Sequence, residues 1–89
     1  MLYNLDGVIH LKITVRYLGT ELYNLEEEHQ LDNDLTLEVF LKKIVHQLGT
    51  DYTDFINETT VLINNEVKNN DAILKDGDIV LILQVLGGG

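Results

Sequence analysis

The residues of this sequence that could support chemistry by themselves lie at its end, where Leu86 is followed by Gly87, Gly88 and Gly89. Glycine lacks a Cβ atom and adopts nearly any φ, so the glycines predict a thin, adaptable segment. If the main-chain carboxylate of Gly89 is the reactive group, this segment can carry it into a narrow channel of another protein. Ordering each residue there costs about 1–2 kcal/mol of conformational entropy, so another surface of the domain must bind the partner.

Other reactive arrangements are missing or weak. The sequence has no cysteine, which excludes disulfides, thiolate metal sites and a side-chain sulfur nucleophile or carrier. The histidines, His10, His29 and His46, stand at unrelated spacings, so we expect no metal site and no bound cofactor. No nucleophile and base converge in the pattern, and a small domain has little room for a cleft. We therefore expect a co-substrate or a non-catalytic subunit rather than an enzyme.

Length and composition limit the possible partners. The chain has 89 residues, of which 45% are hydrophobic and 24% charged, and these values predict a single compact domain. Its formal net charge of -9 disfavours nucleic acid and favours a basic surface on a partner protein. The first residues lack a signal-peptide pattern, and the apolar run at 79–86 is too short to span a bilayer. We therefore expect no membrane association and a cytoplasmic location.

The spacing of apolar residues predicts the strands and the helix that must position the glycines. Residues 9–18 alternate and predict a half-buried strand, followed by a turn at 19–20 and a second, antiparallel strand within 21–31. The buried face of the first strand consists of Ile9, Leu11, Ile13, Val15 and Tyr17. Residues 36–48 predict one amphipathic helix, capped by Thr36 or Asp34 at its start and by Gly49 at its end. Its apolar stripe consists of Leu37, Phe40, Leu41, Ile44, Val45 and Leu48.

The last third of the sequence predicts more strands. After a polar connection through 50–59, the pattern predicts a strand at 60–64, a turn-rich passage with a very short strand at Val67, and a last strand at 79–86. One helix packed across a mixed sheet of four or five strands is an α+β two-layer domain. The order permits a parallel pairing of the first and last strands in the middle of the sheet, which is the arrangement of the ubiquitin-like, or β-grasp, fold.

The alternation of the last strand also predicts a docking surface. If Val80 and Ile82 face the helix, then Leu81, Leu83 and Val85 form an apolar patch on the open face of the sheet. An exposed apolar patch on a small domain is typical of a docking surface. The alternatives are a strand covered on both faces and self-association through this face. The predicted partner-binding residues are Leu81, Leu83, Val85 and Leu86.

The segment VLINNEVKNNDAILKDGDIVLILQVLGGG resembles the C-terminal half of the small β-grasp sulfur carriers, the molybdopterin synthase small subunit and the thiamine-pathway carrier. Members of this family typically have a strand that ends in Asn, a Leu before an acidic Gly turn, and an apolar strand that ends in Gly-Gly. The matching residues here are Asn64 or Asn65, Leu74, Asp76, Gly77, Asp78 and the closing glycines. The stretch ITVRYLGTEL before the helix is similar to the molybdopterin synthase subunit, whereas LILQVLGGG is similar to the thiamine carriers.

The resemblance implies a β-grasp domain over 1–86 and a flexible tail over 87–89. It also implies that an E1-like adenylyltransferase uses ATP to activate Gly89, that a sulfur donor converts it into a thiocarboxylate, and that a synthase takes the sulfur. The pterin-binding large subunit of molybdopterin synthase is the slightly favoured destination, and thiazole synthase is the second. Two other hypotheses stay open: a ubiquitin-like modifier joined to lysines through Gly89, and an interaction module with an inert tail.

Overall fold

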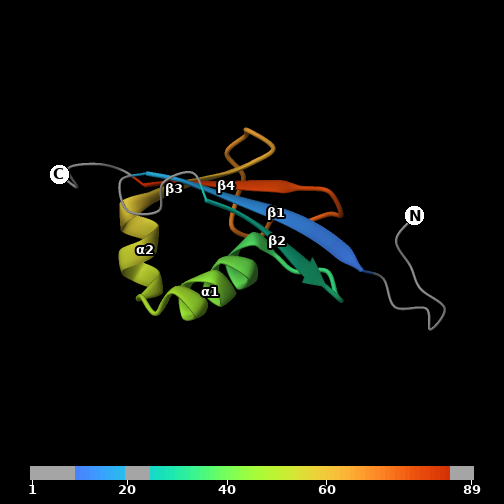
Figure 1. Cartoon of the computed structure of the whole chain (residues 1–89), viewed down its shortest axis with the longest axis horizontal. Coiled ribbons are helices and arrows are strands. Elements are labelled where there is room, and N and C mark those ends of the chain that lie inside the picture. Colours follow the sequence, from blue (N-terminus) through green and yellow to red (C-terminus); the bar gives the residue numbers. More distant parts are fainter. Residues whose placement is uncertain (1–9, 20–24, 85–89) are drawn as a thin grey trace.

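The computed structural model describes residues 10–19 and 25–84 of the chain (Figure 1). Within these ranges the chain forms one four-stranded sheet and two helices that lie against one of its faces. In chain order, the elements are β1 (Leu11–Leu18), β2 (Leu25–Leu31), α1 (Leu37–Leu48), α2 (Tyr52–Glu58), β3 (Thr59–Ile63) and β4 (Ile79–Gln84). Neither helix in these ranges has the length and apolar character that crossing a membrane requires.

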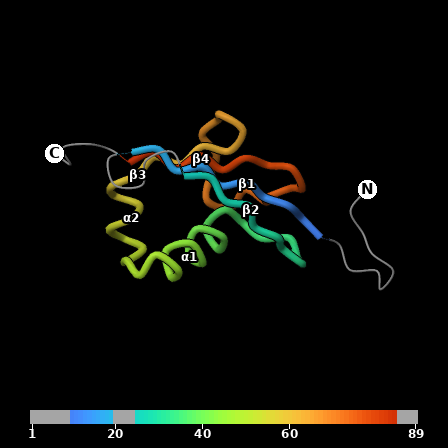
Figure 2. The backbone as a smooth tube through the Cα atoms, viewed as in Figure 1, coloured from blue at the N-terminus to red at the C-terminus, as the bar shows by residue number. Residues whose placement is uncertain are grey.

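The sheet has the strand order β2-β1-β4-β3. β1 and β4 pair in parallel in the middle, and each pairs antiparallel with an edge strand, β1 with β2 and β4 with β3. Because the central strands are parallel, both end at the same end of the sheet (Figure 2). Leu18 at the end of β1 lies opposite Leu83 near the end of β4. This topology confirms the predicted α+β class and the β-grasp arrangement, with four strands in the part of the chain that is described.

Alternation along the central strands directs their apolar residues toward the helices. In β4, Val80 and Ile82 are completely buried, and they lie opposite Val15 and Tyr17 of β1 in the parallel register. The buried core residues of β1 and α1 are Leu11, Ile13, Val15, Tyr17, Leu37, Phe40, Leu41, Ile44 and Val45. The predicted buried faces of the first and last strands are therefore confirmed for the described residues from Leu11 to Ile82, whereas Ile9 lies outside the described residues.

α1 begins and ends where the sequence predicts. Thr36 Oγ1 accepts a hydrogen bond from the backbone N–H of Val39 at 3.3 Å. Gly49, with a φ of 74°, ends the helix in the left-handed conformation, and its N–H donates to the carbonyl oxygen of Val45 at 3.0 Å. The predicted burial of Leu48 is wrong, since this residue is 43% exposed. Leu48 follows the last core residue of the helix, and the chain leaves α1 immediately after it.

The predicted polar connection after α1 is wrong, because this segment contains α2. Asp51 caps the helix by accepting a hydrogen bond from the backbone N–H of Asp54 at 3.2 Å. The residues of α2 that pack on the core are Tyr52, Phe55 and Ile56. Thr, Asp and Asn have weak helix propensity, so burial of this apolar side stabilises the helix more than its intrinsic preference does. β3 then begins at Thr59, one residue before the predicted strand.

The connection from β3 to β4 begins with a tight turn. Asn64 and Asn65 have φ values of 51° and 68°, and the backbones of Ile63 and Glu66 exchange hydrogen bonds of 2.9 and 3.0 Å across them. These are the features of a two-residue type I′ hairpin turn. The strand predicted at Val67 is wrong: the pairing ends in an isolated bridge at Glu66, and Val67 is 78% exposed. Beyond the bridge the chain leaves β3, so Val67 has no neighbouring strand to pair with.

The Asp76-Gly77-Asp78 turn fastens the start of β4 to the start of β1. The backbone N–H of Lys12 donates to Asp76 Oδ1 at 2.8 Å, and the N–H of Gly77 donates to the carbonyl oxygen of Lys12 at 2.9 Å. Asp78 Oδ1 accepts a hydrogen bond from Asn64 Nδ2 at 2.9 Å, which ties the turn to the end of β3 as well. The acidic turn therefore helps to set the register of the three strands before β4 runs toward the end of the chain.

Candidate docking face and tail base

The face of the sheet opposite the helices carries an apolar patch on β4 and its neighbours. Because alternate residues of β4 point into the core, the residues between them point to this face. Leu81 lies opposite Leu62 of β3, and Leu83 lies opposite Leu18 of β1. These four leucines are half-buried, and Ile79 at the start of β4 is 41% exposed. We name Leu18, Leu62, Ile79, Leu81 and Leu83 the open-face patch.

Two of the predicted partner-binding residues, Leu81 and Leu83, lie side by side with patch residues of both neighbouring strands. The other two, Val85 and Leu86, lie outside the described residues. The tail residues 87–89 lie outside them too, so the predicted reactive group is not placed.

Sequence reasoning missed the patch residues that come from β1 and β3. Leu18 is an apolar residue on the otherwise polar face of β1, and Leu62 lies between two residues that face the helices. Both are visible in the sequence. Joining them to one surface requires the register between strands that are distant in the chain, and alternation within one strand does not provide it.

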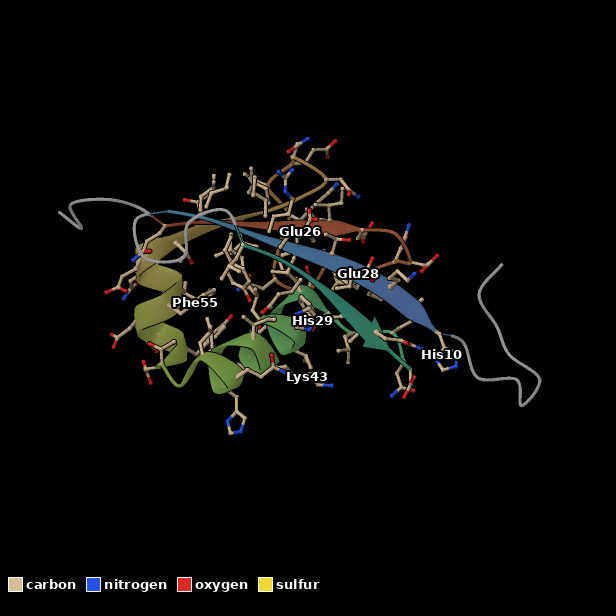
Figure 3. The ribbon with its side chains drawn as sticks, in the orientation of Figure 1. His10, Glu26, Glu28, His29, Lys43 and Phe55 are labelled. Atoms are coloured by element: carbon tan, nitrogen blue, oxygen red, sulfur yellow. The ribbon has the colours of Figure 1, made fainter. Side chains whose placement is uncertain are left out.

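The half of the open face on β1 and β2 is charged. Arg16 Nε lies 3.5 Å from Glu26 Oε2, with both side chains more than half exposed, and Glu28 lies opposite Thr14 (Figure 3). Exposed ion pairs contribute about 0–1 kcal/mol, so stability alone does not explain this half. Because Arg16 also lies opposite Leu81, the charged half directly borders the patch. An apolar centre with a polar margin is the usual anatomy of a protein interface.

Gln84 is the last described residue of β4, and residues 85–89 follow it in the sequence. Gln84 lies between Gly19, at the end of β1, and Thr59, at the start of β3. Thr59 Oγ1 donates a hydrogen bond to the carbonyl oxygen of Phe55 at 2.7 Å, which joins this corner to α2. Three strands and the end of α2 therefore meet at Gln84, and the ends of β1 and β4 lie beside α2 and β3 in Figure 1.

On the helix side of the sheet, a polar cluster holds the edge strand β2. Glu27 Oε1 accepts a hydrogen bond from the Tyr17 hydroxyl at 3.3 Å and lies 3.2 Å from Nε2 of His29. The His29 ring packs edge-on against Phe40 of α1, with ring centroids 5.5 Å apart (Figure 3). Burial first, and then the charge and hydrogen bond of Glu27, raise the pKa of Tyr17 to about 12. The cluster therefore connects β2 to both β1 and α1.

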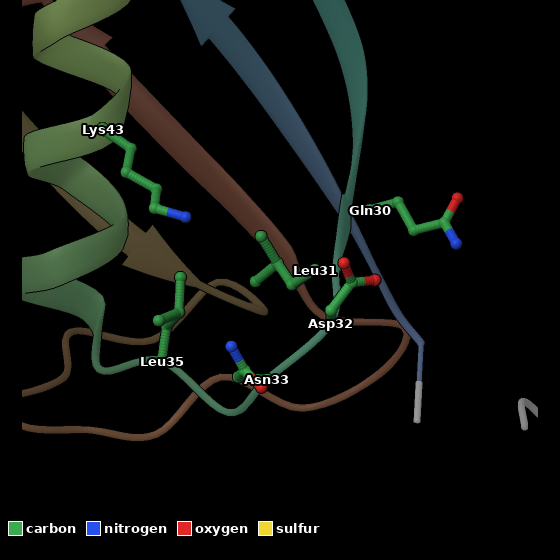
Figure 4. A pocket seen from close by; sticks show the side chains of 6 residues that line it. All are labelled: Gln30, Leu31, Asp32, Asn33, Leu35 and Lys43. Carbon is green, nitrogen blue, oxygen red and sulfur yellow. The ribbon is translucent and has the colours of Figure 1, made fainter. Parts of the chain in front are cut away.

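A shallow pocket of about 140 Å³ lies beside the connection between β2 and α1 (Figure 4). Its lining residues are Gln30, Leu31, Asp32, Asn33, Leu35 and Lys43. Asp32 Oδ1 lies 3.1 Å from His10 Nδ1, so its carboxylate is already engaged. Because Leu31 pairs with Leu11, the pocket lies at the start of β1, the opposite end from Gln84. Among the residues described, no three His, Asp or Glu side chains gather as they would around a metal ion.

The sequence matches the model of the ThiS family over residues 15–89. This range includes β4, the whole open-face patch and the terminal glycines. No curated protein matches the sequence.

Solved structures with the same fold include two proteins from different organisms. The chain is similar to a Pyrococcus furiosus protein described as molybdopterin converting factor, subunit 1, with 20% identity and a TM-score of 0.67, covering 85% of this chain and 99% of that chain. It is also similar to the Haloferax volcanii HVO 2177 protein, with 18% identity and a TM-score of 0.68, covering 90% of this chain and 88% of that chain. At these identities the likeness establishes a shared fold. Because the family model matches most of the sequence, the chain belongs to the ThiS family of small ubiquitin-like sulfur carriers.

Proposed function

We propose that the protein carries sulfur as a thiocarboxylate on Gly89 and delivers it to a synthase of cofactor biosynthesis. The observation that carries this proposal is the ThiS family match through residue 89, which includes the terminal glycines together with the β-grasp strands. The fold supports it, because three strands converge on Gln84, from which the chain continues toward those glycines.

Loading of Gly89 takes two steps. A carboxylate is a poor electrophile, because it is anionic and has no good leaving group. In the first step, an E1-like adenylyltransferase joins a carboxylate oxygen of Gly89 to the α-phosphorus of ATP and releases pyrophosphate. In the second step, a hydrosulfide sulfur attacks the carbonyl carbon and expels AMP, which leaves the thiocarboxylate. Two easier steps thus replace a difficult one, and the protein is a co-substrate that supplies the acyl group.

The open-face patch supplies binding free energy for this reaction. Ordering the three tail glycines on a partner costs about 3–6 kcal/mol in total. Covering the parts of Ile79 and the patch leucines that remain exposed contributes on the order of 1 kcal/mol for each side chain. The two terms are of similar size, so docking through the patch can offset the ordering of the tail. The same face serves the activating enzyme and the synthase in turn.

We place the pterin-binding large subunit of molybdopterin synthase first among the destinations, and thiazole synthase second. The description of the Pyrococcus furiosus protein and the similarity of ITVRYLGTEL support the first. The ThiS family match and the LILQVLGGG ending support the second. We place the reaction in the cytoplasm, where ATP is available to the activating enzyme.

Mass spectrometry of the intact protein tests the loading reaction. The chain ending at Gly89 is incubated with an E1-like adenylyltransferase, ATP, magnesium and hydrosulfide. We expect the mass to rise by the difference between one sulfur and one oxygen atom, and to stay unchanged when ATP is omitted.

Two matched variants locate the reactive group. One lacks Gly89, and the other carries one alanine after Gly89; both keep the β-grasp domain, and we expect neither to gain sulfur. Equal sulfur incorporation by either variant would contradict the proposal, as would an unmodified wild-type chain beside a carrier that the same enzyme does load. Conjugates on lysines of other proteins, without a thiocarboxylate, would support the modifier hypothesis instead.

A further inference from the structure

We infer that Gly19 is a positioning residue for the tail: its missing side chain lets the end of β1 close against Gln84, and this contact fixes Gln84 as the point from which the chain continues toward Gly89. The inference rests on the proposed function, since it concerns the delivery of Gly89 to the adenylyltransferase. Gly19 belongs neither to the terminal glycines nor to the open-face patch.

The contact between Gly19 and Gln84 is close. A Cβ atom on Gly19 would lie 2.5 Å from Gln84 Cβ, 3.3 Å from its backbone nitrogen and 3.3 Å from its Oε1. Two Cβ atoms do not approach so closely in proteins, and the backbone of Gln84 cannot move aside as the tip of a flexible side chain can. Gly19 also has a φ of 156°, which residues with side chains rarely adopt. Any larger residue at position 19 must therefore push the end of β1 and Gln84 of β4 apart.

The other side of Gln84 leaves little freedom for this displacement. Gln84 is paired with Thr59 of β3, and Thr59 is bound through its hydroxyl to the carbonyl oxygen of Phe55. A side chain at position 19 pushes Gln84 toward this fixed neighbour or out of the plane of the sheet. Either movement displaces the point from which the chain continues toward Gly89.

The chemistry depends on that starting point. An adaptable tail that starts from a displaced point brings the Gly89 carboxylate to the α-phosphorus of ATP in fewer of the docked complexes, and misplacement of a reacting group by about 1 Å can lower a rate by about 100-fold. Docking depends on the open-face patch, and three of its five residues, Leu62, Ile79 and Leu81, are not chain neighbours of Gly19 or Gln84. A substitution at Gly19 should therefore lower kcat for adenylation and change KM for the carrier much less.

The described residues offer a matched control for a glycine-to-alanine change. Gly77, in the turn before β4, has a φ of 89°, but nothing lies within 4 Å of a Cβ atom built there. Gly77→Ala therefore introduces backbone strain without a collision and without touching Gln84. Gly19→Ala introduces both, so the difference between the two variants reports the contact with Gln84.

The test measures pyrophosphate release by an E1-like adenylyltransferase as a function of the concentration of the full chain. We expect Gly19→Ala to lower kcat about 10- to 100-fold with KM within about threefold of the wild type, and Gly77→Ala to keep the wild-type kcat. The double variant Gly19→Ala, Gln84→Gly removes one of the two colliding Cβ atoms, and we expect it to recover most of the lost kcat relative to Gly19→Ala. Urea unfolding of every variant shows which are folded under the assay conditions.

The kinetic and folding results either support or overturn the positioning role of Gly19. Wild-type kcat in Gly19→Ala, an equal loss in Gly77→Ala, or no recovery in the folded double variant would each overturn the inference. If Gly19→Ala does not fold, recovery of folding and adenylation together in the double variant supports the inference, and a folded but inactive double variant overturns it. A wild-type chain that is not adenylated would refute the proposed function itself, which separates the two failures.

Discussion

At the scale of single residues, Tyr17 shows how closely one buried group depends on its neighbours. Its side chain is buried in the core, and its hydroxyl donates to Glu27, which also contacts His29. Two titratable side chains, Tyr17 and His29, therefore share one carboxylate oxygen of Glu27. Burial and the adjacent negative charge both favour the neutral phenol, and the pKa of Tyr17 is raised to about 12.

This shift predicts a loss of stability at alkaline pH. In the unfolded chain Tyr17 ionises near pH 10.0, whereas in the folded protein it keeps its proton up to about pH 12. The unfolded state therefore binds fewer protons between these values, and the stability that Tyr17 contributes is complete below pH 10.0 and is lost as the pH rises through about 12. We expect Tyr17→Phe to make the free energy of unfolding, measured with urea, fall less steeply over this interval. Equal slopes for the variant and the wild type would contradict this assignment.

Asn64 gives a structural reason for a residue that the sequence resemblance singles out. It adopts a left-handed conformation, which asparagine tolerates better than most residues with side chains. Its Oδ1 accepts a hydrogen bond from the backbone N–H of Ile79 at 3.0 Å, and its Nδ2 donates to Asp78. Asn64 thus forms the turn after β3 and fixes the start of β4 at once. Glycine would allow the same turn but could make neither side-chain hydrogen bond.

At the scale of elements, the hydrophobic period predicts the parts whose burial is regular. β1 and α1 could be predicted, because every second residue of the strand and one side of the helix are apolar. α2 could not, because its seven residues are rich in polar types that also occur in turns, and the deciding factor is contact with the core. The strand expected at Val67 is absent for the opposite reason. The local sequence favours a strand there, but among the described residues no neighbouring strand pairs with Val67.

The contribution of α2 to stability can be measured through Phe55, which is 5% exposed. Phe55→Ala removes the buried ring and leaves a cavity, so we expect the free energy of unfolding to fall by about 3–5 kcal/mol. Thr53→Ala, at an exposed position of the same helix, is the control, and we expect a change within about 0.5 kcal/mol. Urea unfolding monitored by circular dichroism measures both. A loss below about 1 kcal/mol in Phe55→Ala would show that α2 is not an integral part of the core.

At the scale of the whole molecule, the two faces of the sheet have different tasks. One face holds the core, and the other divides into the open-face patch and a charged half. The sequence predicted Leu81 and Leu83 for this face, because alternation within β4 is enough to place them. Leu18 and Leu62 could not be assigned, because their position depends on the pairing of strands far apart in the chain. The net charge of -9 adds a reason to expect a partner with a basic surface.

The role of the patch predicts a kinetic effect distinct from that of Gly19. Ile79, at 41% exposure, contributes apolar area that a partner can cover, so Ile79→Ser should weaken docking by about 1 kcal/mol and raise KM for the carrier about five- to tenfold. Its kcat for adenylation should stay close to the wild-type value, because the contact between Gly19 and Gln84 is unchanged.

Val39→Ser is the matched control, since Val39 is 44% exposed on α1, on the helix side of the sheet, and its loss should leave KM unchanged. Steady-state pyrophosphate release with the E1-like enzyme measures both constants. Equal KM values for the two variants would mean that the activating enzyme docks elsewhere. A higher KM in Ile79→Ser alone would locate binding on the open face. The contact between Gly19 and Gln84 would then affect kcat separately from docking.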